Sequence, residues 1–144
     1  MDGLGRLFNV VPKASGIDIP LKAGTAVTFV IYEDGGDTQA TVQEGIDGAS
    51  NQDLDVVDTL YYGSGVGGVW GKATIATPLA LIQKKDHGLG DDTVTSDAAV
   101  ICVDAAELSA GYNTVQCTVD AGECIAILHD LTVQRAPENL AALV

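Results

Sequence analysis

The six residues 63–68 come nearest to a known chemical site, because their glycine spacing is that of a nucleotide-binding loop. A dinucleotide site needs a helix directly after such a loop, since the helix N-terminus holds the pyrophosphate. Residues 69–75 are instead rich in β-forming types. A P-loop is excluded as well, because Ala73 stands where a serine or threonine would bind magnesium. We therefore interpret the glycines as a tight turn between strands.

The two histidines, His87 and His129, lack the spacing of a zinc site, and the sequence contains no Gly-x-Ser-x-Gly hydrolase motif. His129 alternates with Ile125 and Ile127 in a strand-like run. It is therefore predicted to be a hydrogen-bonded core or interface residue rather than a catalytic base. From these residues we expect a protein that is not an enzyme and has no cofactor.

Acidic pairs are a third kind of candidate site. The groups that could chelate calcium are Asp53 with Asp55 and Asp58, Asp34 with Asp37, and Asp91 with Asp92. None follows the order of an EF-hand, so we interpret them as solvated loop residues. Paired carboxylates for glycoside hydrolysis stay open, although few aromatic rings are present to hold a sugar. These rings are Tyr32, Tyr61, Tyr62, Trp70 and Tyr112.

The three cysteines, Cys102, Cys117 and Cys124, are odd in number and lack C-x-x-C spacing. This pattern is typical of small buried residues in a protein made in a reducing cytosol. A bridge between Cys117 and Cys124 across a hairpin stays open but is not required.

Charge excludes two classes of partner. The chain carries 20 acidic and 7 basic residues, a net charge of -13, and residues 33–58 and 86–130 contain no Lys or Arg. Nucleic acids and anionic membranes are bound through clusters of Lys and Arg side chains, so neither is an expected partner. The acids serve solubility and self-repulsion, or they form an acidic docking face for a basic partner.

Residues that alternate with period two predict strands along most of the chain. The predicted strands are 6–11, 25–33, 38–44, 55–62, 69–76, 79–83, 98–103, 114–120 and 123–134. Strands 114–120 and 123–134 are predicted to form a hairpin about the turn at Asp120-Ala121-Gly122. Asp104 and Glu107 predict one capped helical turn, whereas residues 51–61 fit a strand or a helix. The fold predicted for 1–144 is one all-β domain, an antiparallel sandwich or jelly roll.

Three segments carry a resemblance to a known class of protein: GRLFNVVP at 5–12, GVGGVW at 65–70 and AILHDLTVQR at 126–135. They resemble small virion proteins of tailed bacteriophages, of the kind encoded near the major capsid protein in phages of actinobacteria. The resemblance implies a capsid decoration (cement) protein, made in the host cytoplasm and bound to the major capsid protein on the outside of the virion. A tail or head-completion protein is one alternative. Another is a β-sandwich binding module for carbohydrate or a host surface, with Tyr61, Tyr62 and Trp70 as its candidate site.

The ends of the chain are candidate contacts with the capsid or with neighbouring subunits. Residues 1–12 and 136–144 carry apolar side chains that either pack as terminal strands or reach a neighbour. The candidate contact residues are Leu7, Phe8, Leu140, Leu143 and Val144. Strand 123–134 is apolar on both faces, and one core covers only one of them. We therefore expect a homo-oligomer, with a trimer favoured because capsids present sites of local three-fold symmetry.

Overall fold

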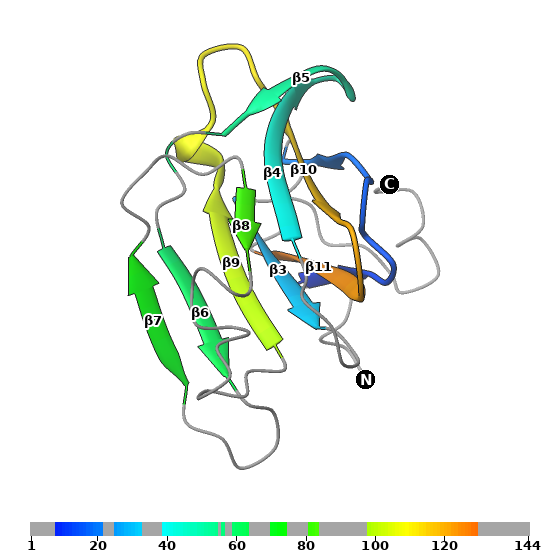
Figure 1. The fold of residues 1–144 in the computed structure, drawn as a ribbon. Helices are drawn as coiled ribbons and strands as arrows, with labels where there is room; N and C mark the ends of the chain where they lie inside the picture. The colour runs from blue at the N-terminus through cyan, green and yellow to red at the C-terminus, as the bar shows by residue number, and fades with distance from the viewer. Residues whose placement is uncertain are drawn as a thin grey trace.

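The computed structural model describes residues 8–21, 25–32, 39–54, 56, 59–63, 70–74, 81–83 and 98–129. The regular elements of these residues are strands, apart from one turn of 3₁₀ helix. The strands are β1 (Phe8–Val11), β2 (Ile19–Pro20), β3 (Ala26–Tyr32), β4 (Gln39–Ile46), β5 (Ala49–Asp53), β6 (Thr59–Gly63), β7 (Gly71–Thr74), β8 (Leu81–Gln83), β9 (Ala98–Asp104), β10 (Thr114–Val119) and β11 (Glu123–His129). They form two packed antiparallel sheets, so the predicted all-β sandwich is confirmed (Figure 1).

The first sheet has six strands in the order β1-β11-β3-β9-β6-β7, and neighbouring strands are antiparallel. In β3 the buried side chains of Val27, Phe29 and Ile31 alternate with less buried ones. β-branched and aromatic residues at every second position suit a pleated strand with one face in the core. β9 and β11 follow the same alternation, so this sheet turns one continuous apolar face inward.

The second sheet has the order β2-β10-β4-β5, and β8 also pairs with the first residues of β4. β4 and β5 are joined by the two-residue loop Asp47-Gly48, whose φ angles are 51° and 77°. Positive φ at both positions is the signature of a type I′ turn, which matches the twist of the strands it joins. The predicted strands leave out residues 45–50, whereas the turn creates an additional strand, β5.

The core lies between the two sheets. Its largest fully buried apolar side chains include Phe29, Ile101 and Leu128 from the first sheet and Val42 and Val115 from the second. Three polar residues are also buried, namely Asn9, Glu44 and Thr114. Each strand of the core thus contributes one face, and its other face lies on the outside of the sandwich.

The predicted hairpin between residues 114–120 and 123–134 is wrong, although both strands exist. β10 pairs with β4 and β2, whereas β11 pairs with β3 and β1 in the other sheet. Both strands place their small apolar side chains in the core, as Cys117 and Cys124 show. The two strands cover the core from opposite sides, so they cannot pair with each other. The turn at residues 120–122 therefore connects the two sheets.

The predicted helical turn and the segment left open between strand and helix have different outcomes. Ala105–Glu107 form one 3₁₀ turn, and Glu107 Oε2 accepts a hydrogen bond of 2.7 Å from the backbone N–H of Asp104, as the capping pattern predicts. The described part of 51–61 contains no helix. Residues 51–53 lie in β5 and 59–61 in β6, and between these strands the backbone N–H of buried Leu54 donates a hydrogen bond of 3.2 Å to the carbonyl oxygen of Val42.

Several predicted sites lie outside the described residues. These are the contact residues Leu7, Leu140, Leu143 and Val144, as well as the glycines of 65–68. Phe8 is the first residue of β1 and pairs with His129. No helix in the described part of the chain is long and apolar enough to cross a membrane.

Candidate functional site

The outer face of the first sheet, which points away from the second sheet, is the most distinctive surface formed by the described residues. Strand register arranges its centre in two cross-strand rows. They are Val10–Ile127–Thr28–Cys102 and Ile125–Val30–Val100–Tyr61. None of these residues is charged, in a chain whose net charge is -13, and Lys72 of β7 continues the second row beyond Tyr61. We call these eight residues the apolar rows.

Exposure supports the same surface. Among the described residues, six large hydrophobic side chains are exposed, and Val10, Tyr32, Tyr61 and Trp70 belong to this face. Isolated exposed apolar residues are ordinary, but a group on one face marks a binding surface. The prediction that β11 is apolar on both faces is confirmed for its described residues, since Ile125 and Ile127 lie half-buried on the outside.

A chain of three hydrogen-bonding side chains crosses this face. His129 Nε2 lies 2.8 Å from Thr28 Oγ1, which lies 2.9 Å from Cys102 Sγ. His129 is half-buried and hydrogen-bonded, as its strand pattern predicts. The prediction that all three cysteines are buried is wrong for Cys102, which is exposed because it points outward from β9. The hydroxyl of Thr28 on β3 thereby links side chains on its two neighbouring strands, β11 and β9.

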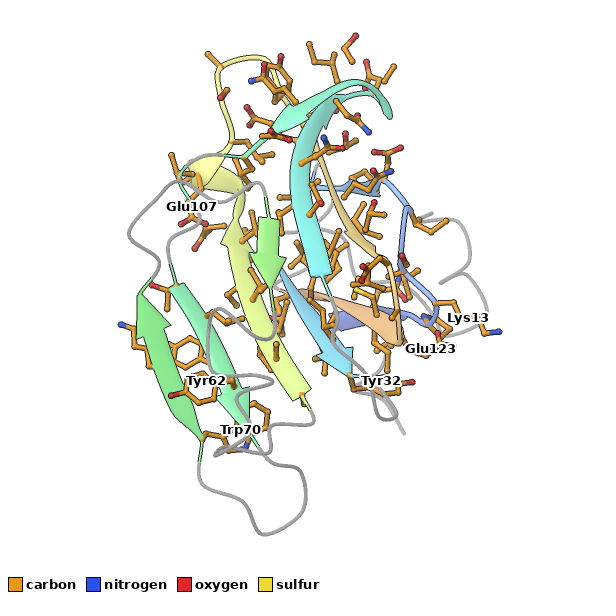
Figure 2. All side chains as sticks on the ribbon, in the orientation of Figure 1. Lys13, Tyr32, Tyr62, Trp70, Glu107 and Glu123 are labelled. Carbon is orange, nitrogen blue, oxygen red and sulfur yellow. The ribbon has the colours of Figure 1, made fainter. Side chains whose placement is uncertain are left out.

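The β6–β7 pair carries the rings of Tyr62 and Trp70 (Figure 2), and each ring lies over a glycine. A methyl group placed on Gly63 would lie 2.7, 2.8 and 2.9 Å from Cδ2, Cε2 and Cε3 of Trp70. On the core side, a methyl group on Gly71 would lie 2.5 Å from Cζ of Tyr62. The rings replace the missing glycine side chains, a recognised device for stabilising strands that contain glycine.

We call Tyr61, Trp70 and Lys72 the aromatic edge of the outer face. Tyr61 pairs with Lys72 across β6 and β7, and Trp70 immediately precedes β7. The structure therefore brings Tyr61 and Trp70 together on the outside but separates Tyr62, which points toward the core. This division requires the strand register, which the sequence alone does not reveal.

The outer side of the second sheet differs in kind. Thr41, Gln43, Gln116 and Thr118 alternate with the buried side chains of β4 and β10. The two glutamines are bonded locally: Gln43 Nε2 donates to Asp53 Oδ1 at 3.0 Å, and Gln116 Nε2 donates to the carbonyl oxygen of Gly16 at 2.9 Å. The amide groups of this polar surface are therefore hydrogen-bonded to neighbouring residues.

Glu44 is a buried carboxylate of the second sheet. Its Oε1 accepts a hydrogen bond of 2.7 Å from Gln52 Nε2, and its Oε2 accepts one of 2.7 Å from the backbone N–H of Ser109. Burial raises the pKa of Glu44, but hydrogen bonds from Ser109 and Gln52 outweigh it, so that the pKa lies below its usual value. Through these hydrogen bonds the carboxylate links the loop after the 3₁₀ turn to β4 and β5.

Cys117 and Cys124 meet in the core as free thiols from opposite sheets. A hydrogen bond between them, together with burial, raises the pKa of Cys117 well above its usual value. The same hydrogen bond lowers the pKa of Cys124. The bridge that the sequence left open is not formed in this structure, and the pair lies in the core rather than on a surface.

Within the described ranges, no three His, Cys, Asp or Glu side chains gather as a metal site would require. Of the aspartates considered for calcium, Asp53 is bonded to Gln43. The other six, namely Asp34, Asp37, Asp55, Asp58, Asp91 and Asp92, lie outside the described residues. No protein-family model, curated protein or solved structure matches this chain.

Proposed function

We propose that this protein is a non-enzymatic structural protein of a phage virion, a decoration protein that binds the outside of the assembled capsid and stabilises it. The observation that carries the proposal is the pair of uncharged apolar rows at the centre of the outer face of the first sheet. In an acidic chain, an uncharged apolar surface of this kind is suited to docking on another protein. The resemblance of the segments at 5–12, 65–70 and 126–135 to small virion proteins supplies the class of partner, the major capsid protein.

The apolar rows suit repeated docking on a lattice. A face built from side chains such as Val10, Ile127 and Val30 offers a modest contact for each subunit. Several modest contacts made at once by a symmetric oligomer raise the effective concentration and give tight attachment. A trimer at sites of local three-fold symmetry remains the proposed assembly. β1, which begins at the predicted contact residue Phe8, lies at one end of the strand order of this sheet.

The test compares one substitution on this face with a matched substitution on the other sheet. Val10 and Ile46 are 37% and 40% exposed, so Val10→Asp and Ile46→Asp change charge and exposed apolar surface similarly. Co-sedimentation with assembled shells should fall at least about tenfold in affinity for Val10→Asp, the effect of losing one good apolar contact. Ile46→Asp should bind like the unmodified protein.

Melting temperatures of both variants should show that each is folded. Equal binding by Val10→Asp and Ile46→Asp would show that the outer face is not the docking surface. Absence of any attachment of the unmodified protein to shells would refute the decoration role itself.

A further inference from the structure

The ring of Trp70 lies flat on the first sheet with its opposite face turned to solvent. Three of its atoms, Cδ2, Cε2 and Cε3, are almost equally far from the position of a methyl group on Gly63. Three neighbouring atoms of a planar ring can be almost equally far from a point outside the ring only when that point lies above the ring face. The Trp70 ring therefore faces Gly63 rather than pointing an edge at it. Because the side chain is nevertheless 51% exposed, its outer ring face is open.

The surroundings of Trp70 form a shallow platform rather than an apolar ridge. The next residues along its row, Gly63 and Ala98, are the smallest available, and Tyr32 follows on β3. Tyr61 lies diagonally across from Trp70, at a Cα separation of about 7–8 Å. Tyr32 is three strands from Trp70, about 14 Å away at the usual strand spacing. Figure 2 shows Trp70 and Tyr32 toward the same end of the sheet.

The chemistry of this platform fits a sugar. The C–H face of a pyranose packs flat on an aromatic ring, while its hydroxyl groups need donors and acceptors around the ring. The indole N–H of Trp70, the hydroxyl of Tyr61 and the ammonium of Lys72 are such groups, and Tyr61 and Lys72 are exposed. The net charge of -13 opposes anionic ligands over the whole molecule.

From this geometry we propose that the aromatic edge binds a neutral oligosaccharide, with one sugar ring stacked on Trp70 and the next contacting Tyr61. The site lies beside the apolar rows that are proposed to dock on the capsid, and it shares only Tyr61 with them. Figure 1 shows β6 and β7 at the opposite side of the first sheet from β11. A subunit attached through β1 and β11 therefore leaves the platform exposed.

The chain contains a single tryptophan, so its intrinsic fluorescence reports directly on this site. Free protein is titrated with cellotetraose, maltotetraose and tetra-N-acetylchitotetraose. At least one of the three should produce a saturable change in the fluorescence of Trp70. Calorimetry then compares the variants, because Trp70→Phe removes the fluorophore but keeps a ring over Gly63.

Tyr61→Ala and Trp70→Phe should each weaken binding of that sugar by about three- to tenfold, the effect of one aromatic contact. Ile46→Ala, an exposed apolar residue of the other sheet, should leave binding unchanged. The proposal is overturned if none of the three sugars binds saturably, or if neither variant weakens binding. It is also overturned if the variants impair attachment to shells without affecting sugar binding, since the edge would then belong to a protein interface. The sugar titrations and the calorimetry use free protein, so their results do not depend on whether the protein attaches to shells.

Discussion

At the scale of single residues, Glu44 shows how a charge is kept inside this sandwich. Its carboxylate is 1% exposed, yet both oxygens accept hydrogen bonds of 2.7 Å. The donors, Gln52 Nε2 and the N–H of Ser109, favour the charged form, so the pKa of Glu44 is lowered despite burial. A lowered pKa means that the charged form of Glu44 stabilises the fold at pH values above the pKa that this residue has in the unfolded chain. That contribution is lost as pH falls through the folded-state value.

Glu44→Gln should therefore destabilise the protein at neutral pH, by about 1.5–3 kcal/mol for hydrogen bonds to a charged group. The amide presents an N–H₂ group to one of two donors and leaves that donor unpaired. Urea unfolding at pH 7 and at acidic pH should show the difference from the unmodified protein shrinking as the carboxylate is protonated. Glu123→Gln, at an exposed position, should stay within about 0.5 kcal/mol throughout. A difference that does not vary with pH would contradict the charged-state explanation.

Two threonines offer a matched comparison of a satisfied and an unsatisfied hydroxyl. Thr114 Oγ1 is buried without a hydrogen-bond partner in the described part of the chain, whereas Thr28 Oγ1 contacts His129 and Cys102. Thr114→Val removes a polar atom that gains nothing from burial, so the free energy of unfolding should stay equal or rise. Thr28→Val should lower it by about 1 kcal/mol. Chemical denaturation of both variants measures the contrast, and a larger loss at Thr114 would contradict it.

At the scale of elements, the β6–β7 pair depends on rings that stand over glycines. Gly71→Ala would place a methyl group against the ring of Tyr62 and force the ring away from the sheet. Overpacking of this kind costs about 1–3 kcal/mol. In a Tyr62→Leu background the same substitution should cost clearly less, because the ring that opposes the methyl group is absent. Thermal unfolding of the four proteins of this double-mutant cycle gives the coupling energy, and strictly additive effects would contradict the packing argument.

The strand pattern made most elements predictable, and the exceptions have physical causes. β3 and β9 alternate apolar residues clearly, because one face of each lies in the core. β5 carries no such pattern: all its residues are exposed, and it is a strand because the Asp47-Gly48 turn folds it back on β4. The alternation of β10 and β11 predicted the strands but not their partners. Partner choice depends on which side of the core each strand occupies.

The candidate site was predictable only in part for a related reason. The apolar second face of β11 is visible from the spacing of Ile125 and Ile127. The grouping of Trp70 with Tyr61, and the removal of Tyr62 to the core side, depend on the register between β6 and β7. Register is set by the turn and by packing across strands, which no local pattern in 59–74 encodes.

At the scale of the whole molecule, the outer surfaces of the two sheets differ in their side-chain chemistry. The second sheet presents Thr and Gln side chains that bond to their neighbours, whereas the first sheet presents uncharged rows. With a net charge of -13 spread over the remainder, copies of the protein repel one another in solution except where these rows meet a complementary surface. The same charge predicts no retention on duplex DNA at about 0.15 M salt, since too few Lys and Arg side chains are available to contact the DNA phosphates.

The proposed docking through the apolar rows predicts how attachment to a capsid would respond to salt. Raising the ionic strength from about 0.15 M to about 1 M shortens the screening length from about 8 Å to about 3 Å, which weakens exposed ion pairs. Apolar contacts are not screened, so the fraction of protein that co-sediments with assembled shells should stay constant across this range. Release at high salt would contradict apolar docking and would point instead to the acidic segments meeting basic capsid patches.

Attachment should also depend on the lattice rather than on the capsid subunit alone. A footprint limited to the apolar rows gives each subunit a small interface, and small interfaces are weak singly. An oligomer that contacts several capsid subunits at once gains effective concentration, so assembled shells should bind at least about a hundredfold more tightly than free subunits. Sedimentation of the protein with shells and with isolated capsid subunits, at matched subunit concentration, makes the comparison. Equal affinity for both would contradict multivalent docking, because a single contact would then account for all of the binding.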